Sequence, residues 1–111
     1  MPQRTITLTG RAPVQIDEDT WPSIAESFAH DGEVVEQAIR KWTLKARQHA
    51  DGRTLVYGVI SSCYRNEERK GGELLSAGDD VPAAIARVGA DLGLDDYLIR
   101  ECVANLPAVT I

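Results

Sequence analysis

Basic and apolar side chains alternate along residues 41–49, and a run rich in Val, Leu, Ile and Tyr follows at residues 54–62. Asp51-Gly52 stands between the two runs, and this dipeptide favours a two-residue β-hairpin turn. Successive side chains of a strand point to opposite faces, so the alternation gives the hairpin one basic and one apolar face. Residues 41–62 therefore predict a central antiparallel hairpin, which constrains the fold more than any other part of the chain.

The predicted turn also determines which residues pair across the hairpin. With Asp51-Gly52 as the turn, Ala46 pairs with Tyr57 and Leu44 pairs with Val59 on the apolar face. The basic face then carries Lys41, Thr43, Lys45, Arg47 and His49, opposite Thr54, Val56, Gly58 and Ile60.

The N-terminal third predicts a strand followed by a helix. Residues 5–9 alternate between threonine and apolar side chains, which predicts a strand with its apolar side chains facing inward at Ile6 and Leu8. Residues 21–30 follow a run of capping acids, and their apolar side chains recur at i, i+3, i+4 and i+7, which is typical of an amphipathic helix. Residues 33–40 fit either a helix or the start of the next strand, and we favour a strand from about Ala38.

The C-terminal half predicts a charged loop over residues 64–72, a short strand at residues 73–76 and two helices. Asp79-Asp80 stands at the capping position of one helix, Pro82 suits its first turn, and Gly93 suits its C-terminal cap. Asp95-Asp96 caps the last helix, and Pro107 ends it. The inward stripes of the two helices carry Val81, Ile85, Val88 and Leu92, and Ile99, Cys102, Val103 and Leu106.

Together these elements predict an α+β fold: a small antiparallel sheet, with its central hairpin at about 41–62, and two to three helices packed on one face. A length of 111 residues suits a single domain over residues 1–111. The chain has neither a run of ~18 apolar residues nor the apolar N-terminus of a signal peptide, so we expect a cytoplasmic protein with no membrane contact. In that reducing compartment, Cys63 and Cys102 are expected to be free thiols.

The charge of the chain is acidic overall and unevenly distributed. The net charge is −5, whereas dedicated nucleic-acid-binding proteins are usually basic. Residues 40–53 nevertheless hold five basic residues and one acid, and residues 73–101 hold seven acids and two basic residues. Such polarity favours a partner with a complementary electrostatic field.

Residues suited to catalysis or metal binding are few. His49 and Asp51 flank the predicted turn, and a hairpin tip offers no cleft for a substrate, so we interpret them as a solvated pair. Cys63 has no histidine near it in the sequence to activate a thiolate. The histidines and cysteines also lack the spacing of a metal site. We therefore expect no catalytic residue, no metal and no cofactor, and keep a small enzyme that uses His49 or Cys63 as an alternative.

Surface residues are the stronger candidates for function. The basic hairpin face suits an anionic partner, although such lysines also protect a sheet from unwanted pairing. Val56 on the same face would add an exposed apolar contact, and the charged loop adds side chain types that often dominate interfaces. The expected partner-binding residues are Lys41, Lys45, Arg47, His49, Arg53, Val56, Tyr64, Arg65, Arg69 and Lys70.

Two stretches, RKWTLKARQHADGRTLVYG at residues 40–58 and GGELLSAGDDVPAAIARV at residues 71–88, carry a family resemblance. They look similar to short, uncharacterised bacterial proteins carried on plasmids, prophages and other mobile elements. The resemblance covers roughly the middle two-thirds of the chain and brings no catalytic motif. It implies an accessory protein that acts by contact with host machinery, as small acidic inhibitors of the anti-CRISPR kind do.

The sequence thus favours a non-enzymatic binding module, and the most specific hypothesis is a mobile-element inhibitor or modulator of host nucleic-acid machinery. Its partner would be a protein or a ribonucleoprotein. Direct binding of nucleic acid through the basic hairpin face is the first alternative, and a small enzyme is the second. A homodimer is also compatible with the predicted sheet, because an open strand edge invites pairing.

Overall fold

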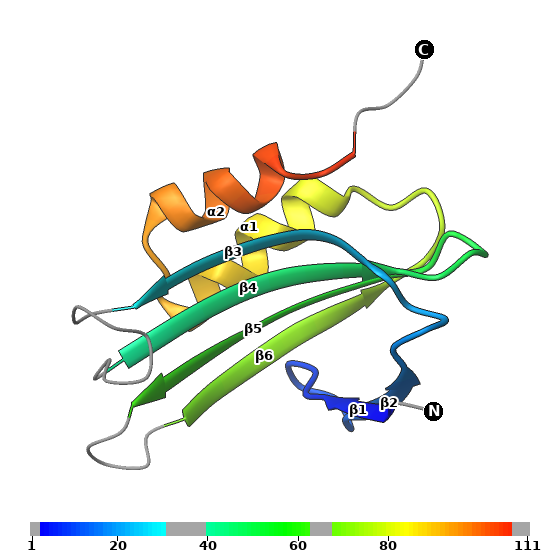
Figure 1. Ribbon diagram of the computed structural model, residues 1–111, viewed down its shortest axis with the longest axis horizontal. Helices are drawn as coiled ribbons and strands as arrows, with labels where there is room; N and C mark the ends of the chain where they lie inside the picture. The colour runs from blue at the N-terminus through cyan, green and yellow to red at the C-terminus, as the bar shows by residue number, and fades with distance from the viewer. Residues whose placement is uncertain (1–2, 31–39, 63–67, 108–111) are drawn as a thin grey trace.

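The computed structural model describes residues 3–30, 40–62 and 68–107, and it shows the α+β fold that the sequence predicts. Four antiparallel strands form one sheet in the order β3-β4-β5-β6, and β1 pairs with β2 in a separate hairpin (Figure 1). No helix in these ranges is long and apolar enough to cross a bilayer. The elements are β1 (Gln3–Ile6), β2 (Val14–Asp17), β3 (Ser23–His30), β4 (Arg40–Gln48), β5 (Thr54–Ser62), β6 (Glu68–Leu75), α1 (Val81–Leu92) and α2 (Asp96–Ala104).

Both helices pack on one face of the four-stranded sheet, as predicted (Figure 1). α1 lies over β5 and β6, and α2 lies against β3 and α1. Ile85 and Cys102 are fully buried on the inward sides of the two helices. The cluster that we call the helical core comprises Ala25, Leu44, Ala46, Val56, Leu75, Ala84, Ile85, Val88, Leu92, Leu94, Leu98 and Cys102.

The ends of the helices lie where the sequence predicts them. Asp80 Oδ1 accepts a hydrogen bond from the Ala83 N–H at 3.1 Å and so caps α1. Gly93 ends α1 with a φ of 73°, a left-handed conformation that glycine adopts without strain. α2 begins after Asp95 and ends before Pro107, but the Asp95 side chain makes no capping hydrogen bond, so the predicted cap is present by position only.

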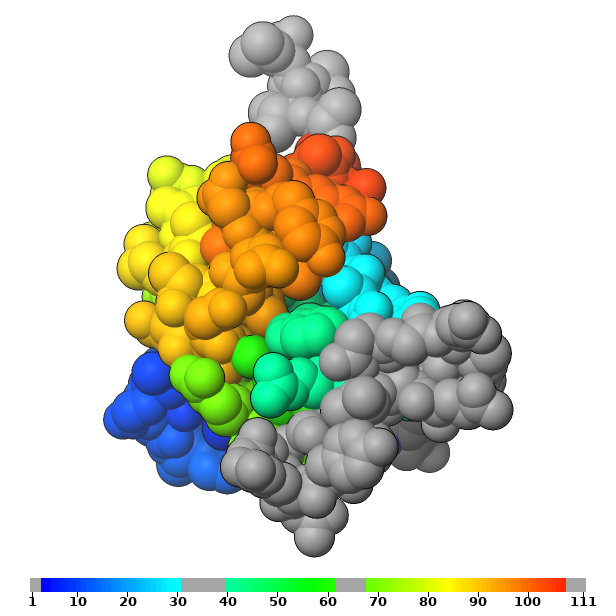
Figure 2. Space-filling view, turned by 90° about the vertical axis from the view of Figure 1, so that its left-hand side faces the viewer, coloured from blue at the N-terminus to red at the C-terminus, as the bar shows by residue number. Residues whose placement is uncertain are grey.

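β1 and β2, which we call the N-terminal hairpin, pack on the other face of the sheet. The view onto the end of the sheet shows the helices on one side and this hairpin on the other (Figure 2). Ile6 and Leu8 point inward, as the alternation of residues 5–9 predicts. The cluster that we call the hairpin core comprises Ile6, Leu8, Ile16, Trp21, Leu55 and Tyr57.

The N-terminal chain crosses β6 at Gly72. The Gly72 N–H donates to Thr9 Oγ1 at 3.1 Å, and the Gly72 carbonyl accepts from the Thr9 N–H at 2.8 Å. A Cβ at Gly72 would lie 2.7 Å from the Val56 carbonyl oxygen and 2.9 Å from Tyr57 Cβ, closer than real Cβ atoms come, and 3.0 Å from the Thr7 carbonyl oxygen. The close approach of β5, together with the crossing chain, therefore requires glycine at this position.

β3 is a strand, so the helix predicted over residues 21–30 is wrong. A bulge between Ser23 and Ala25 places both Ile24 and Ala25 against the helical core. Two adjacent apolar side chains on one side interrupt the period of two and imitate the i, i+3, i+4 spacing of a helix. After the bulge the alternation resumes, and Phe28 is exposed on the opposite face.

β4 and β5 form the predicted hairpin, but their register differs by one residue from the prediction. Ala46 pairs with Val56, where the sequence predicts Tyr57 as its partner. The His49 N–H donates to the Arg53 carbonyl at 2.9 Å, so three residues connect the strands, and the last of them, Gly52, has a φ of 97°. This arrangement is a turn followed by a G1 bulge, which shifts the pairing relative to a two-residue turn.

The shifted register exchanges the two faces of β5. Val56 is fully buried in the helical core and Ile60 packs against that core, so the predicted exposure of both residues on the basic face is wrong. Leu55 and Tyr57 lie on the basic face instead, where the N-terminal hairpin buries them.

β6 begins at Glu68, so the predicted loop over residues 64–72 is wrong from that residue onward. Glycines often mark loops, but here a Cβ at Gly71 would lie 2.8 Å from Thr9 Oγ1, so the glycines permit close packing within a strand. The alternatives for residues 33–39 lie outside the described residues, as do Cys63, Tyr64 and Arg65. 

Candidate functional site on the open face of the sheet

The N-terminal hairpin lies under the end of the sheet where β4 turns into β5, and no element that the structure describes packs on the other end of that face (Figure 1). Strand pairing aligns the side chains of the uncovered part in rows across the four strands. One row is Phe28, Thr43, Val59 and Lys70, and the next is His30, Lys41, Ser61 and Glu68. We call these eight residues, with Glu26 and Lys45 of the following row, the open face.

Three lysines and two glutamates of the open face carry its fixed charges. Lys45 Nζ lies 3.2 Å from Glu26 Oε2, and Lys70 Nζ lies 3.1 Å from Glu68 Oε1. Lys41 makes no ion pair with any residue that the structure describes. The Lys70–Glu68 pair is exposed on both sides, and exposed ion pairs contribute only ~0–1 kcal/mol, so Lys70 is free to exchange its glutamate for another anion. The Lys45 side chain is half-buried beside Glu26.

Phe28 is the exposed apolar group of the open face, with 41% of its surface accessible. Its ring packs beside that of His30, with 5.7 Å between the ring centroids. His30 Nδ1 is buried and has no hydrogen-bond partner among the described residues. The sequence prediction missed this part of the site because it assigned Phe28 to a helix. The period of two in Glu26, Phe28 and His30, which alternate with the small Ser27 and Ala29, was the available signal.

Arg47 lies on the same side of β4 as Lys45, but the N-terminal segment buries it, and only 6% of its surface is accessible. Arg47 Nε donates to Tyr57 Oη at 3.0 Å, and Nη1 donates to the Trp21 carbonyl at 2.9 Å. Glu18 Oε1 lies 3.8 Å from Arg47 Nη2. Arg47 therefore links β4 to the N-terminal segment (residues 3–22) through Trp21 and Glu18. Its predicted exposure to a partner is wrong.

His49, Asp51 and Arg53 form the tip of the β4–β5 hairpin. The Asp51 carboxylate accepts from the Arg53 N–H at 3.0 Å and from Arg53 Nε at 2.7 Å, and the backbone bond is the main cause that lowers the pKa of Asp51. His49 Nδ1 accepts from the Asp51 N–H at 3.1 Å. The Trp21 ring lies 5.1 Å from the His49 ring and 5.3 Å from the Arg53 guanidinium. The His49–Asp51 pair thus stabilises the loop.

The structure brings Lys41, Lys45 and Lys70 together on the open face and separates the other predicted binding residues from them. Arg69 lies on the helical side of β6, where its Nη2 donates to the Asp91 carbonyl at 3.4 Å. His49 and Arg53 lie at the hairpin tip, and Arg47 and Val56 are buried.

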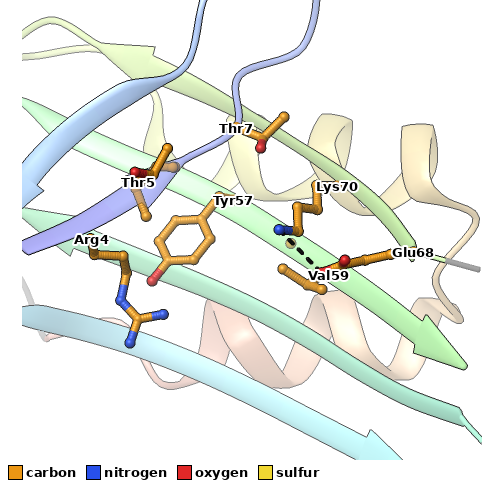
Figure 3. A pocket seen from close by; sticks show the side chains of 9 residues that line it. Arg4, Thr5, Thr7, Tyr57, Val59, Glu68 and Lys70 are labelled. Atoms are coloured by element: carbon orange, nitrogen blue, oxygen red, sulfur yellow. Dashed lines mark ion pairs between the residues drawn. The ribbon is translucent and has the colours of Figure 1, made fainter. Parts of the chain in front are cut away.

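A pocket of about 270 Å³ opens between β1 and the open face (Figure 3). Lys70 and Glu68 point toward one another on one side of the Tyr57 ring, and Arg4 lies on the other side (Figure 3). Thr5 and Thr7 contribute hydroxyl groups to its wall. The pocket combines the cations of Arg4 and Lys70, the Glu68 carboxylate, hydroxyls and apolar side chains, and its volume is just below the usual range of ligand sites, which begins at about 300 Å³.

Cys102 lies in the helical core and not on the open face. Cys102 is fully buried, and this burial, with smaller contributions from Glu26 and Glu101, raises the pKa of its thiol to about 11. Within residues 3–30, 40–62 and 68–107, no cluster of three or more His, Cys, Asp or Glu side chains is arranged to hold a metal ion.

Comparisons with protein-family models, with curated proteins and with solved structures find no match to this chain.

Proposed function

We propose that this protein is a non-enzymatic binding module whose open face engages a macromolecular partner. The observation that carries the proposal is the open face, where Phe28 is exposed, with Lys41 and Lys45 in the neighbouring rows and Lys70 at the other end of its own row. Aromatic side chains are enriched at binding interfaces, and the surrounding charges orient a partner and select its sign.

The surroundings of His49, Asp51 and Cys102 support binding over chemistry. His49 Nδ1 accepts a backbone hydrogen bond within its own loop, and the Asp51 carboxylate is bonded to Arg53. The Cys102 thiol is buried, and its raised pKa keeps it protonated and a poor nucleophile at neutral pH.

The more specific form of the proposal follows the sequence resemblance to mobile-element proteins. In this form, the protein inhibits or modulates host machinery that handles nucleic acid, and its partner is a protein or a ribonucleoprotein. The polarity of the molecule supports such an interaction, because residues 73–101 carry a net charge of −5 and the open face carries an excess of lysine.

Affinity capture with matched variants tests the proposal. The chain exposes two large apolar side chains among its described residues: Phe28 on the open face, and Tyr97, which is 54% exposed, on α2. We expect a stoichiometric partner at about 0.15 M salt, where long-range steering is already screened. The Phe28→Ala and Lys41→Glu variants should lose it, and the Tyr97→Ala variant should retain it. Equal capture by all variants, or no stoichiometric partner, would contradict the proposal.

A further inference from the structure

We infer, on the basis of the proposed function, that the open face binds a single-stranded segment of nucleic acid, with one base stacked on Phe28 and the flanking phosphates on lysines. The partner is then an unpaired, anionic strand, either free or presented by a ribonucleoprotein.

The spacing of the lysines around Phe28 supports this assignment. Phe28 pairs with Thr43, and Thr43 lies midway between Lys41 and Lys45 on β4. Four residues of a strand span about 13 Å, so an ammonium group lies on each side of the exposed ring along the strand direction. A nucleotide that stacks on Phe28 would therefore place its 5′ and 3′ phosphates toward different lysines.

The chemistry of the exposed ring favours an unpaired base. Phe28 is 41% exposed and lies beside His30, so both rings lie at the edge of the open face. Aromatic side chains on a sheet stack with bases that are not in a duplex, while lysines along the path bind the backbone. A duplex would hide its base faces from Phe28, and the broad face of a sheet does not enter a groove as a helix does.

The distribution of charge directs an anionic strand to this face. The open face carries three lysines and two glutamates, and each glutamate already pairs with one of the lysines. The segment of residues 73–101, which includes α1 and most of α2, carries seven acids and two basic residues and repels the same strand. The molecule therefore presents one favourable side to a polyanion although its net charge is −5.

The pocket beside Tyr57 extends the proposed path beyond Lys70. Its volume of about 270 Å³ suits one base or one phosphate group, and the hydroxyls of Thr5 and Thr7 offer hydrogen bonds to either. A strand that runs from Phe28 across Val59 would reach this pocket at Lys70, because these residues share one row.

Fluorescence anisotropy with labelled oligo-dT and oligo-U dodecamers tests the inference. We expect the Kd to rise about tenfold between 0.1 and 0.3 M NaCl, because three lysines that replace counterions give a salt slope near −2 for a single strand. The Phe28→Ala variant should bind about 5- to 100-fold more weakly, as expected for one lost stack. The Lys41→Glu/Lys45→Glu variant should lose binding, and the Tyr97→Ala variant should match the wild type.

Three results would each overturn the inference. They are absence of binding at 0.05 M NaCl, equal effects of Phe28→Ala and Tyr97→Ala, and equal affinity for a duplex of the same length. Far-UV circular dichroism of every variant checks that it is folded. If no oligonucleotide binds but a protein is captured in a Phe28-dependent manner, the proposed function stands and the nucleic-acid assignment fails.

Discussion

Arg47 connects the sheet to the N-terminal segment through a pair of buried hydrogen bonds. Its guanidinium donates to Tyr57 Oη and to the Trp21 carbonyl, and the side chain is 8% exposed. Removal of a buried donor leaves its acceptors without partners, and each unpaired polar group costs about 1–3 kcal/mol. The contribution of Arg47 to stability therefore depends on the residues around it rather than on its charge.

We predict that Arg47→Ala lowers the free energy of unfolding by about 2–4 kcal/mol, as measured by urea denaturation. Arg87→Ala is the matched control, because Arg87 pairs with Glu73 at 3.0 Å in an exposed ion pair. The control should change the free energy of unfolding by less than about 1 kcal/mol. Similar losses in the two variants would show that Arg47 is not the structural link described here.

The buried thiol of Cys102 makes the free energy of unfolding fall as the pH rises into the alkaline range. Burial raises the pKa of its thiol from an ordinary value of 9.0 to about 11, because the helical core disfavours the thiolate. The unfolded chain ionises first as the pH rises, so the stabilisation is complete below pH 9 and is lost between pH 9 and about 11.

Between pH 8 and pH 10, we predict that the free energy of unfolding falls by about 1 kcal/mol more in the wild type than in Cys102→Ala. Urea titrations of both proteins at both pH values give this difference, because the contributions of all other titrating groups are the same in the two proteins and cancel. In a Cys63→Ser background, a thiol reagent should label Cys102 only after denaturant is added. Parallel pH profiles, or rapid labelling of the native protein, would refute the buried, neutral thiol.

At the scale of elements, local signals predicted the β4–β5 hairpin and both helices. Capping by Asp80 and the left-handed Gly93 depend on near neighbours, so their sequence signals are reliable. The register of the hairpin was less accessible, because Asp51-Gly52 suits a two-residue and a three-residue loop alike. Burial of Val56 in the helical core accompanies the longer loop, and that contact spans distant parts of the chain.

The candidate site was only partly predictable for the same reason. Lys41 and Lys45 were identified by their type and by strand alternation, and Lys70 was identified as a member of a charged loop. The burial of Arg47 depends on the N-terminal segment, and no local pattern shows that this segment packs on the sheet face. Phe28 was hidden by the bulge in β3, which disturbs the period of two.

The length of the β4–β5 loop leads to a prediction at this scale. Deletion of Ala50 leaves Asp51-Gly52 as a two-residue turn and keeps His49 opposite Arg53, so we expect a loss of less than about 1 kcal/mol in the free energy of unfolding. Deletion of Thr43 from the middle of β4 is the control, since no loop absorbs it and one part of the strand must turn its core side chains outward.

Urea denaturation of the two deletion variants gives the comparison. The Thr43 deletion should cost more than about 3 kcal/mol or prevent folding, because it misplaces either Trp42 or Leu44. A large loss on deletion of Ala50 would show that the three-residue loop itself stabilises the hairpin, and that the register does not tolerate the shorter turn.

At the scale of the whole molecule, one sheet serves two cores. β5 supplies Val56 to the helical core and Leu55 and Tyr57 to the hairpin core, so neither core exists without the central strands. Elements that share buried strands are expected to unfold together, in a single cooperative transition. The open face is the part of this sheet that neither core uses.

The two tryptophans report on the two cores separately and make this cooperativity testable. Trp21 is buried in the hairpin core, and Trp42 packs against the helical core. We predict that the fluorescence midpoint in urea coincides with the far-UV circular dichroism midpoint in both Trp21→Phe and Trp42→Phe.

Leu8→Ala, which perturbs only the hairpin core, should lower both midpoints in the Trp21→Phe background, although Trp42 lies on the other side of the sheet. Loss of the Trp21 signal in Trp42→Phe at a lower urea concentration than the circular dichroism change would show instead that the N-terminal hairpin detaches first, because β1 and β2 pair only with each other.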